Sequence, residues 1–378
     1  MSSSISVRQG SSNNPDAVAA VAELAAQLHQ PGIRGVIFFC SSSYELASLG
    51  PAIAGAFPAI AVVGCTSSGQ IGSGGFQLGG LSGVSLAGDE LVMSPMPIVG
   101  LEKARTHAAA LARTIHDRAP LPRGWRSFGL LLVDGLSLAE ERLTSALYEN
   151  LRDVPLVGGS AGDDLRFART HVYYDGAFHT DAAVFTVFDT SAPFEIFRFQ
   201  HFEPTATTLV ISDADPENRV VREINGQPAA MAYAAAVGVP VEALTAEVFS
   251  DHPLLVNLGG DHYVRSISRV DANLGLVLLC AIEDGLVVRL GRGVDVTNTA
   301  ERALRDVSAR VAVDGTRTLL LGCDCILRRL EFQNNGVDAK VGALYAELGV
   351  FGFSTYGEQY NGVHVNQTFT GIALGGVA

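Results

Sequence analysis

Three copies of one pattern limit the folds that this sequence can adopt. Each copy contains an apolar strand, a helix, a second strand and a turn rich in small residues, and a further strand follows. The copies cover residues 35–70, 129–164 and 318–362, and they begin with GVIFFC, GLLLVD and TLLLGCD. A repeated unit of this kind predicts equivalent strands and turns in equivalent positions of the fold.

Small residues align between the copies. Gly64 of the first copy aligns with Gly158 of the second, and Cys40 aligns with Asp134 at the same offset along the chain. In the third copy the connection between strand and turn is longer, and Gly352 takes the place of Gly64. Glycine at a strand end permits positive φ angles and a close approach of two backbones. The turn therefore has an architectural role, whereas its polar residues differ between copies.

These patterns predict an α/β fold in which helices cover sheets. Between the second and third copies, alternating apolar and polar residues over 263–293 indicate antiparallel strands. We expect two packed domains, built in part from the repeated strand-helix-strand-turn-strand unit. Their limits are 31–200 for the first domain and 201–378 for the second, after an N-terminal segment with the first helix over 1–30.

Composition and charge narrow the classes of function. The chain has 378 residues, 48% of them hydrophobic, and a net charge of −13. Binding to nucleic acid requires a basic surface, so we expect no nucleic-acid partner. No apolar run approaches the roughly 18 residues of a membrane-spanning helix. The N-terminus also lacks a signal-peptide pattern, so we expect a cytoplasmic protein without membrane insertion. The five scattered cysteines indicate buried free thiols.

Four segments together resemble a known family. VVGCTSSGQI, PLVGGSAGDD, NGQPAAMAY and FGFSTYGEQYNGVHVNQTFTGIAL are similar to motifs of the paired FIST N and FIST C domains of bacterial sensory proteins. The resemblance implies a stand-alone sensor that binds a small or gaseous ligand and regulates a signalling partner such as a histidine kinase. Some stand-alone members are haem proteins that sense nitric oxide. The resemblance leaves open whether this chain binds haem, and the sequence leaves open whether it forms a homodimer.

Haem would need an axial ligand in an apolar pocket, and histidine is a common one. His201 lies between Phe199 and Phe202 where the second predicted domain begins, and an aromatic cleft there would suit a porphyrin. His201 is accordingly the candidate metal ligand, and His364, in GVHVNQT, is the second candidate for cofactor binding. The alternative for His201 is an ordinary half-buried histidine. The sequence has no CxxCH motif, which excludes covalent c-type attachment.

A second version of the sensor needs no metal and binds a small polar metabolite such as an amino acid. The turns of the second and third copies carry acids and amides, and two arginines follow the strand of the third copy, where they could hold a carboxylate. The candidate ligand-binding residues are Ser160, Asp163, Asp164, Arg328, Glu358, Asn361 and Asn366, with Gln367 and Arg329 beside them. The alternative is that the acids only stabilise turns by accepting backbone N–H bonds.

Two motifs leave other chemistry open. Ser160 fits the pattern GxSxG formally, so a hydrolase-like enzyme that uses Ser160 or the Cys65 loop is the alternative from another class. A nucleophile elbow requires a helix after the serine, and the sequence predicts a strand there. Cys323 and Cys325 form a CxC pair, which is typical of either buried thiols or part of a metal or redox site, but no second pair completes a zinc site.

Overall fold

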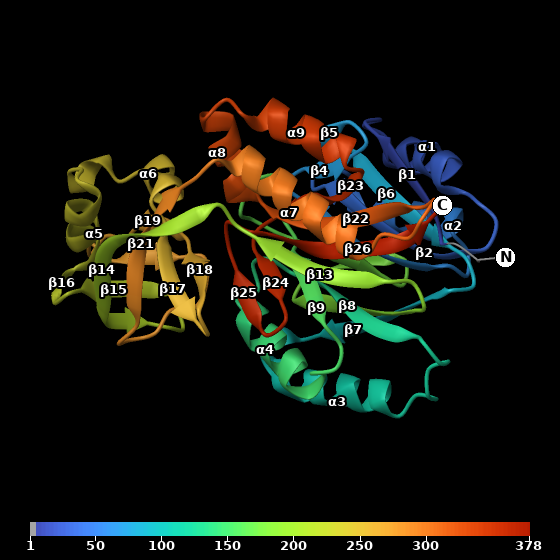
Figure 1. The fold of residues 1–378 in the computed structure, drawn as a ribbon, viewed down its shortest axis with the longest axis horizontal. Helices are drawn as coiled ribbons and strands as arrows, with labels where there is room; N and C mark the ends of the chain where they lie inside the picture. Colours follow the sequence, from blue (N-terminus) through green and yellow to red (C-terminus); the bar gives the residue numbers. More distant parts are fainter. Residues whose placement is uncertain (1–4) are drawn as a thin grey trace.

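The computed structural model describes residues 5–378 and shows a large body with one smaller domain inserted into it (Figure 1). The body consists of three copies of one unit, named here repeats 1, 2 and 3. Each runs strand, helix, strand, helix, strand, hairpin, strand, and repeat 3 has two helices at the second helical position. The predicted α/β class with helix-covered sheets is confirmed. Each unit is longer than predicted, because a leading strand and helix belong to it.

The bounds of the elements show the equivalence of the repeats. Repeat 1 consists of β1 (Ser6–Ser12), α1 (Ala17–Leu28), β2 (Ile33–Ser41), α2 (Leu46–Ala56), β3 (Ala61–Ser67), β4 (Gln70–Gly72), β5 (Gly75–Gln77) and β6 (Leu81–Ala87). Repeat 2 consists of β7 (Leu91–Val99), α3 (Ala104–His116), β8 (Arg126–Val133), α4 (Glu140–Asn150), β9 (Leu156–Ser160), β10 (Val172–Tyr174), β11 (Ala177–His179) and β12 (Ala182–Thr190). Repeat 3 consists of β13 (Phe194–Phe199), α7 (Val296–Arg310), β22 (Arg317–Cys325), α8 (Ile326–Asn334), α9 (Asp338–Glu347), β23 (Val350–Thr355), β24 (Glu358–Tyr360), β25 (Val363–Val365) and β26 (Phe369–Val377).

Each repeat forms one mixed sheet, and a hairpin from another repeat completes it. The strand orders are β1-β6-β2-β3-β10-β11, β7-β12-β8-β9-β24-β25 and β13-β26-β22-β23-β4-β5. In every sheet the second and third strands of the repeat pair in parallel, as β2 does with β3. The hairpin of repeat 1 joins repeat 3, that of repeat 2 joins repeat 1, and that of repeat 3 joins repeat 2. The three repeats are thus closed in a ring.

The three sheets share one central core, and helices cover their outer faces. Side chains from all three sheets meet in this core, where the Phe39 and Phe353 rings stack with centroids 4.1 Å apart. Helices α1 and α2 cover the first sheet, α3 and α4 the second, and α7 to α9 the third. Because both faces are buried, the inner strands read as continuous apolar runs such as residues 128–133 of β8.

Glycine recurs at one position of the repeat because two backbones meet there. Gly64, Gly158 and Gly352 occupy equivalent places on β3, β9 and β23. A Cβ atom on any of them would collide with the carbonyl oxygen of the paired residue on the neighbouring parallel strand. These oxygens belong to Phe38, Leu131 and Gly322. The predicted alignment of the three glycines is therefore correct, and its cause is close backbone approach.

The predicted alignment of Cys40 with Asp134 is wrong by one residue. Phe38 pairs with Gly64, whereas Leu131 pairs with Gly158, so the register makes Ser41 the equivalent of Asp134. The connection between the paired positions is one residue longer in repeat 2, and equal spacing in the sequence concealed this difference.

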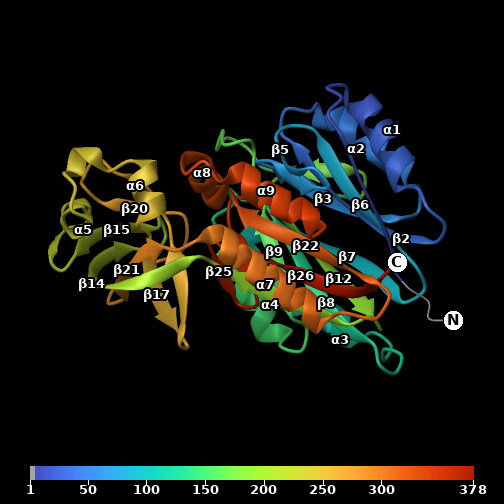
Figure 2. The same ribbon diagram turned by 45° about the horizontal axis from the view of Figure 1, so that its top comes forward.

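The inserted domain (residues 202–293) interrupts repeat 3 between β13 and α7. Figures 1 and 2 show it at one end of the molecule, beside the body. It consists of β14 (Phe202–Asp215), β15 (Val220–Ile224), β16 (Gln227–Pro228), α5 (Ala229–Val237), α6 (Ala246–Asp251), β17 (Leu254–Leu258), β18 (Asp261–Arg265), β19 (Ile267–Val270), β20 (Leu276–Leu278) and β21 (Val287–Gly293). All its strand pairs are antiparallel, as the pattern over 263–293 predicts, and they surround a core of their own. The predicted limit between residues 200 and 201 falls where the chain leaves the body, and the predicted domain 201–378 contains both the inserted domain and most of repeat 3.

Candidate functional site

The candidate site is a cavity of 350 Å³ where the inserted domain meets the body, named here the cleft cavity. The body contributes residues from the loops that follow β8, β9 and β23 and from the start of α8 after β22, which means the carboxyl ends of its parallel strands. Ligands of α/β proteins commonly bind outside that edge of a sheet. The inserted domain contributes residues from β19, β20 and the start of β15. The cleft cavity therefore combines the usual ligand edge with a domain boundary.

Two larger hollows lie between neighbouring repeats, at the opposite ends of the strands. Their volumes are 590 Å³, beside β1 and the end of α9, and 390 Å³, beside α2 and β7. The described residues that line them include no buried charged side chain. The cleft cavity, in contrast, has such groups.

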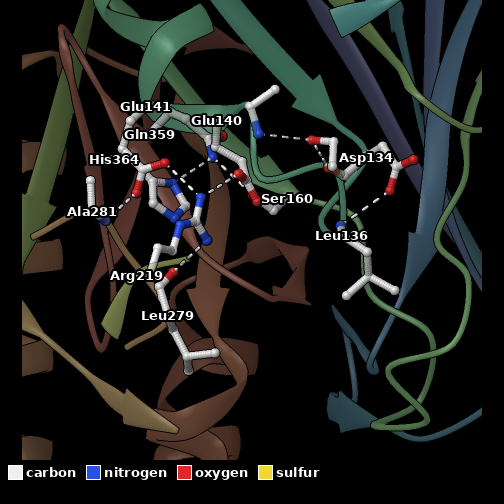
Figure 3. A network of polar contacts seen from close by, with 12 residues as sticks. Asp134, Leu136, Glu140, Glu141, Ser160, Arg219, Leu279, Ala281, Gln359 and His364 are labelled. Carbon is white, nitrogen blue, oxygen red and sulfur yellow. Dashed lines mark hydrogen bonds and ion pairs between the residues drawn. The ribbon is translucent and has the colours of Figure 1, made fainter. Parts of the chain in front are cut away.

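An ion triad that includes Glu140 and Arg219 of the cavity lining lies beside the cleft cavity, and Figure 3 shows its side chains. The Arg219 guanidinium of the inserted domain lies 2.8 Å from the Glu140 carboxylate and 2.6 Å from that of Glu141, at the start of α4. Arg219 also donates to the Leu279 carbonyl, and the Ala281 N–H donates to Glu141. Burial alone would lower the pKa of Arg219, but the two carboxylates outweigh it and raise that pKa. The triad thus fastens the inserted domain to repeat 2.

Bulky residues with strained backbones face the cleft cavity. Leu138 and Phe167 line it with φ angles of 55° and 50°, and Arg219 has a φ of 55°. Left-handed backbone at such residues is uncommon, and strain of this kind clusters at binding sites. Leu138 and Phe167 are also large apolar side chains that remain 51% and 53% exposed. The Phe167 ring stacks on Tyr356 with centroids 4.6 Å apart. Apolar surface is therefore left open toward the cavity.

Asp163 and Asp164 shape the rim of the cavity through loop hydrogen bonds. Asp163 accepts the backbone N–H groups of residues 167, 168 and 169 at 2.7–2.9 Å and a further bond from the Tyr356 hydroxyl. Asp164 accepts bonds from Ser41 and from the backbone and side chain of Ser42. Asp163 thus stabilises its own loop, and Asp164 links that loop to the residues at the end of β2 in repeat 1.

Three other predicted ligand residues gather in a buried polar cluster that does not line the cleft cavity. Ser160, Glu358 and Asn366 are fully buried, and His364 is nearly so. The Gln359 amide, which the sequence analysis did not select, donates to Ser160 at 3.0 Å and lies 3.2 Å from Nδ1 of His364 (Figure 3). Burial raises the pKa of Glu358 to about 8. The junction of repeats 2 and 3 therefore holds a carboxyl group whose pKa lies well above its ordinary value.

The remaining predicted ligand residues have structural partners. Asn361 occupies the β24–β25 turn, and its side chain accepts the Leu156 N–H at 3.3 Å. Arg328 is fully buried and donates to Asp324 at 2.7 Å. Gln367 joins the body to the inserted domain, because it accepts from Ser266 and donates to the Ser250 carbonyl, both at 2.9 Å. Arg328, Asn361 and Gln367 are not among the residues that line the cleft cavity.

The two candidate histidines do not fit haem as the structure places them. His201 is 1% exposed, and burial lowers its pKa. Its Nε2 lies 2.6 Å from Glu331 and its Nδ1 3.2 Å from Arg328, so both ring nitrogens are engaged. Nε2 of His364 has no hydrogen-bond partner among the described residues, but the ring lies against Gly357. The described lining of the cleft cavity includes no His, Cys or Met that could hold iron.

The enzyme-like motifs are equally enclosed. Ser160 ends β9 and is followed by a loop and β10, so the strand-to-helix turn of a nucleophile elbow is absent at this serine. Cys65, Cys323 and Cys325 are free and buried, and burial raises the pKa of each thiol well above its ordinary value. Within residues 5–378 no three His, Cys, Asp or Glu side chains are grouped so as to hold a metal ion. The helices of this same range include none that is long and apolar enough to cross a membrane.

Several residues of the cleft cavity have no distinctive sequence signal. No distinctive sequence motif surrounds Arg219, Phe167 or Arg269. Only the fold brings these three residues together at the cleft cavity. The acidic pair Glu140–Glu141 offers a clue, because it opens a helix directly after a buried strand. Charged groups at such a strand end merit inclusion among candidate site residues.

Comparisons with known proteins identify the family of the chain. A segment of 159 residues is 25% identical to an uncharacterised protein of Methanocaldococcus jannaschii, and it covers 38% of this chain and 30% of that protein. The FIST N family model matches residues 35–227, about half of the chain, and the FIST C family model matches residues 229–361. The chain therefore belongs to the FIST-domain family, whose domains are signal-transduction sensor domains that bind small ligands.

Proposed function

We propose that this protein is a sensor whose small ligand binds in the cleft cavity and changes the position of the inserted domain relative to the body. A signalling partner such as a histidine kinase then responds to that change. The observation that carries the proposal is the strained, partly exposed pair Leu138 and Phe167, which faces a cavity at a domain boundary. Strain of about 1–3 kcal/mol per residue persists where the surrounding structure maintains it, and such sites are commonly functional.

A ligand that touches both walls of the cavity would favour one arrangement of the two parts. A ligand shifts a conformational equilibrium only by its difference in affinity for the two states. The walls belong to different structural units, so a bound molecule bridges them and has such a difference. Movement of the inserted domain must also break or rearrange the bonds of Arg219 to Glu140 and Glu141. The triad is therefore the expected point at which ligand binding and domain position are coupled.

The binding proposal is tested by a thermal-shift screen of small metabolites on the full chain. Saturable stabilisation identifies hits, because a ligand that binds the native state raises its stability. We expect Phe167→Ala to weaken a hit of the cleft cavity at least tenfold, whereas Val99→Ala, an equally exposed apolar position on β7, should leave its affinity unchanged. Hits that bind both variants equally, or a screen without hits, would contradict the proposal.

The regulatory part needs a kinase assay. A hit from the screen should change the autophosphorylation rate of a histidine kinase mixed with the protein, and Phe167→Ala should abolish that change. A rate that responds to the hit in the absence of the protein identifies a direct effect on the kinase, which would argue against regulation by this chain.

The family resemblance implies haem-based sensing of nitric oxide for some members, but we expect that this chain does not bind haem. The residues present do not fit the group, so we expect protein that is expressed with ample haem and then purified to show no stoichiometric Soret band. A band that shifts on anaerobic addition of nitric oxide and disappears in His201→Ala or His364→Ala would overturn this expectation and identify the ligand.

A further inference from the structure

We propose that the ligand of the cleft cavity is a carboxylate with an aromatic or similarly flat apolar body. Arg269 holds the carboxylate, and the ring extends the stack of Phe167 on Tyr356. This inference rests on the proposed function, because it names the chemical class of ligand for the same site.

The charges around the cavity leave one cation without a partner. Arg219 is shared by Glu140 and Glu141, so this triad carries an excess negative charge and disfavours an anion. Arg269 lines the cavity from β19, and its side chain makes no ion pair or hydrogen bond with any other residue in the described range 5–378. A guanidinium binds a carboxylate through two parallel N–H bonds. Arg269 is therefore the place for an anionic group.

The part of the cavity wall that the body contributes offers an aromatic surface. The planes of Phe167 and Tyr356 are inclined by 14°, and Phe167 is 53% exposed. Aromatic rings prefer offset stacks, and a flat ligand on the open side of Phe167 would remove apolar surface from water. Leu138, 51% exposed, adds a further apolar contact beside it. The wall therefore favours a ring over a branched or strongly polar body.

The aromatic wall is held in place before a ligand arrives. The Tyr356 hydroxyl donates to Asp163, and the same carboxylate accepts the backbone N–H of Phe167 at 2.9 Å. One buried acid thus fixes the Tyr356 ring and the backbone of Phe167, and the face of Tyr356 stacks on the Phe167 ring. A wall that is already ordered loses little conformational freedom on binding.

The size of the cavity limits the ligand to a small molecule. Ligand pockets commonly measure roughly 300–1,000 Å³, and the cleft cavity with 350 Å³ is near the lower limit. One ring with a short acid chain matches this volume, and Phe167 and Arg269 both line the cavity.

The test compares four probes by isothermal titration calorimetry on the full chain. The probes are 3-phenylpropionate, its uncharged amide, 3-cyclohexylpropionate and phenylalanine. We expect 3-phenylpropionate to bind about tenfold or more tightly than the amide, because only the acid forms charge-assisted bonds. The cyclohexyl acid should bind more weakly than the phenyl acid. Phenylalanine carries an α-amino group that 3-phenylpropionate lacks, so comparing their affinities shows whether the site prefers an α-amino acid or a simple carboxylic acid.

Matched variants locate the effect. Arg269→Gln should remove the preference for acid over amide, whereas Arg222→Gln, an exposed arginine of the same domain paired with Asp215, should preserve it. Arg269 is exposed, so its replacement leaves the fold intact, which circular dichroism can verify. Equal affinity for acid and amide, or an unchanged preference in Arg269→Gln, would overturn the ligand class.

The two proposals fail in different ways. If no carboxylate binds but another metabolite from the screen binds and requires Phe167, the ligand class is wrong and the sensor site stands. If no molecule in the screen depends on Phe167, the site itself is wrong.

Discussion

The body and the inserted domain are held together by different means. In the body every sheet is buried on both faces, and each repeat receives a hairpin from another repeat. The inserted domain has one antiparallel sheet, and it meets the body through polar contacts at Arg219 and Gln367 and through Val365 of β25, which is buried in the core of the inserted domain. A closed ring resists internal shifts, whereas a unit fastened at few points can move as a whole. The contrast suggests that the body is a rigid frame that holds the loops of the cleft cavity, and that the inserted domain is the part that moves in response to a ligand.

The largest effect is expected where the frame itself is disrupted. Gly158→Val places side-chain atoms against the Leu131 carbonyl oxygen, so we expect a loss of more than about 4 kcal/mol in the free energy of unfolding, or no soluble protein. Gly55→Ala in α2, where an added Cβ meets no atom within 4 Å, should be neutral or stabilising by up to about 1 kcal/mol. Urea unfolding measures both. A Gly158→Val variant as stable as wild type would show that the backbones can separate without loss.

A smaller effect is expected where the two parts are joined. Arg219→Ala leaves Glu140 buried without its partner, so we expect a loss of about 3 kcal/mol in unfolding free energy and faster hydrogen exchange across the boundary between domain and body. Arg222→Ala removes only exposed ion pairs and should cost less than about 1 kcal/mol. If the two variants exchange hydrogen equally slowly at the boundary, the triad is not the fastening point.

A pH-dependent effect is expected at the junction of repeats 2 and 3. Glu358 has a pKa of about 8 in the folded protein against 4.5 ordinarily, so the folded state holds its proton more tightly than the unfolded state. This contribution to stability is complete below about pH 4.5 and is lost as the pH rises through about 8. Glu358→Gln resembles the protonated form and should lose less stability than wild type over that interval. Parallel stability curves for the two proteins between pH 4.5 and 8 would contradict the shifted pKa.

The sequence allowed the repeat to be predicted but not the way in which its copies join. Equivalent strands share a glycine because two backbones approach closely at each of these positions, which are Gly64, Gly158 and Gly352. The exchange of hairpins has no local signal, since pairing of β4 with β23 depends on residues at opposite ends of the chain. The first strand of each repeat was also not predicted. These strands, β1, β7 and β13, lie at sheet edges, and their residue patterns are those of ordinary edge strands.

The candidate site was only partly predictable for a related reason. The structure buries Ser160, Glu358 and Asn366 near His364, whereas the sequence left open whether the turns of the repeats share one cleft. His201 is an attractive metal ligand in the sequence because of its aromatic neighbours, yet Glu331 and Arg328, more than a hundred residues later, occupy its nitrogens. The cleft cavity depends on loops of repeats 2 and 3 and on the inserted domain together, and no single segment reveals it.

The circular exchange of hairpins also has a consequence for synthesis on the ribosome. The hairpin of repeat 1 emerges early, but its partner strand β23 begins only at Val350. The first sheet likewise waits for β10 of repeat 2, and the second for β24 of repeat 3. Contacts between distant segments form slowly, and unpaired strand edges invite aggregation in the meantime. The nascent chain therefore carries an open edge until β23 and β24 have left the exit tunnel, which makes residues 350–360 a checkpoint for the folding of the whole body.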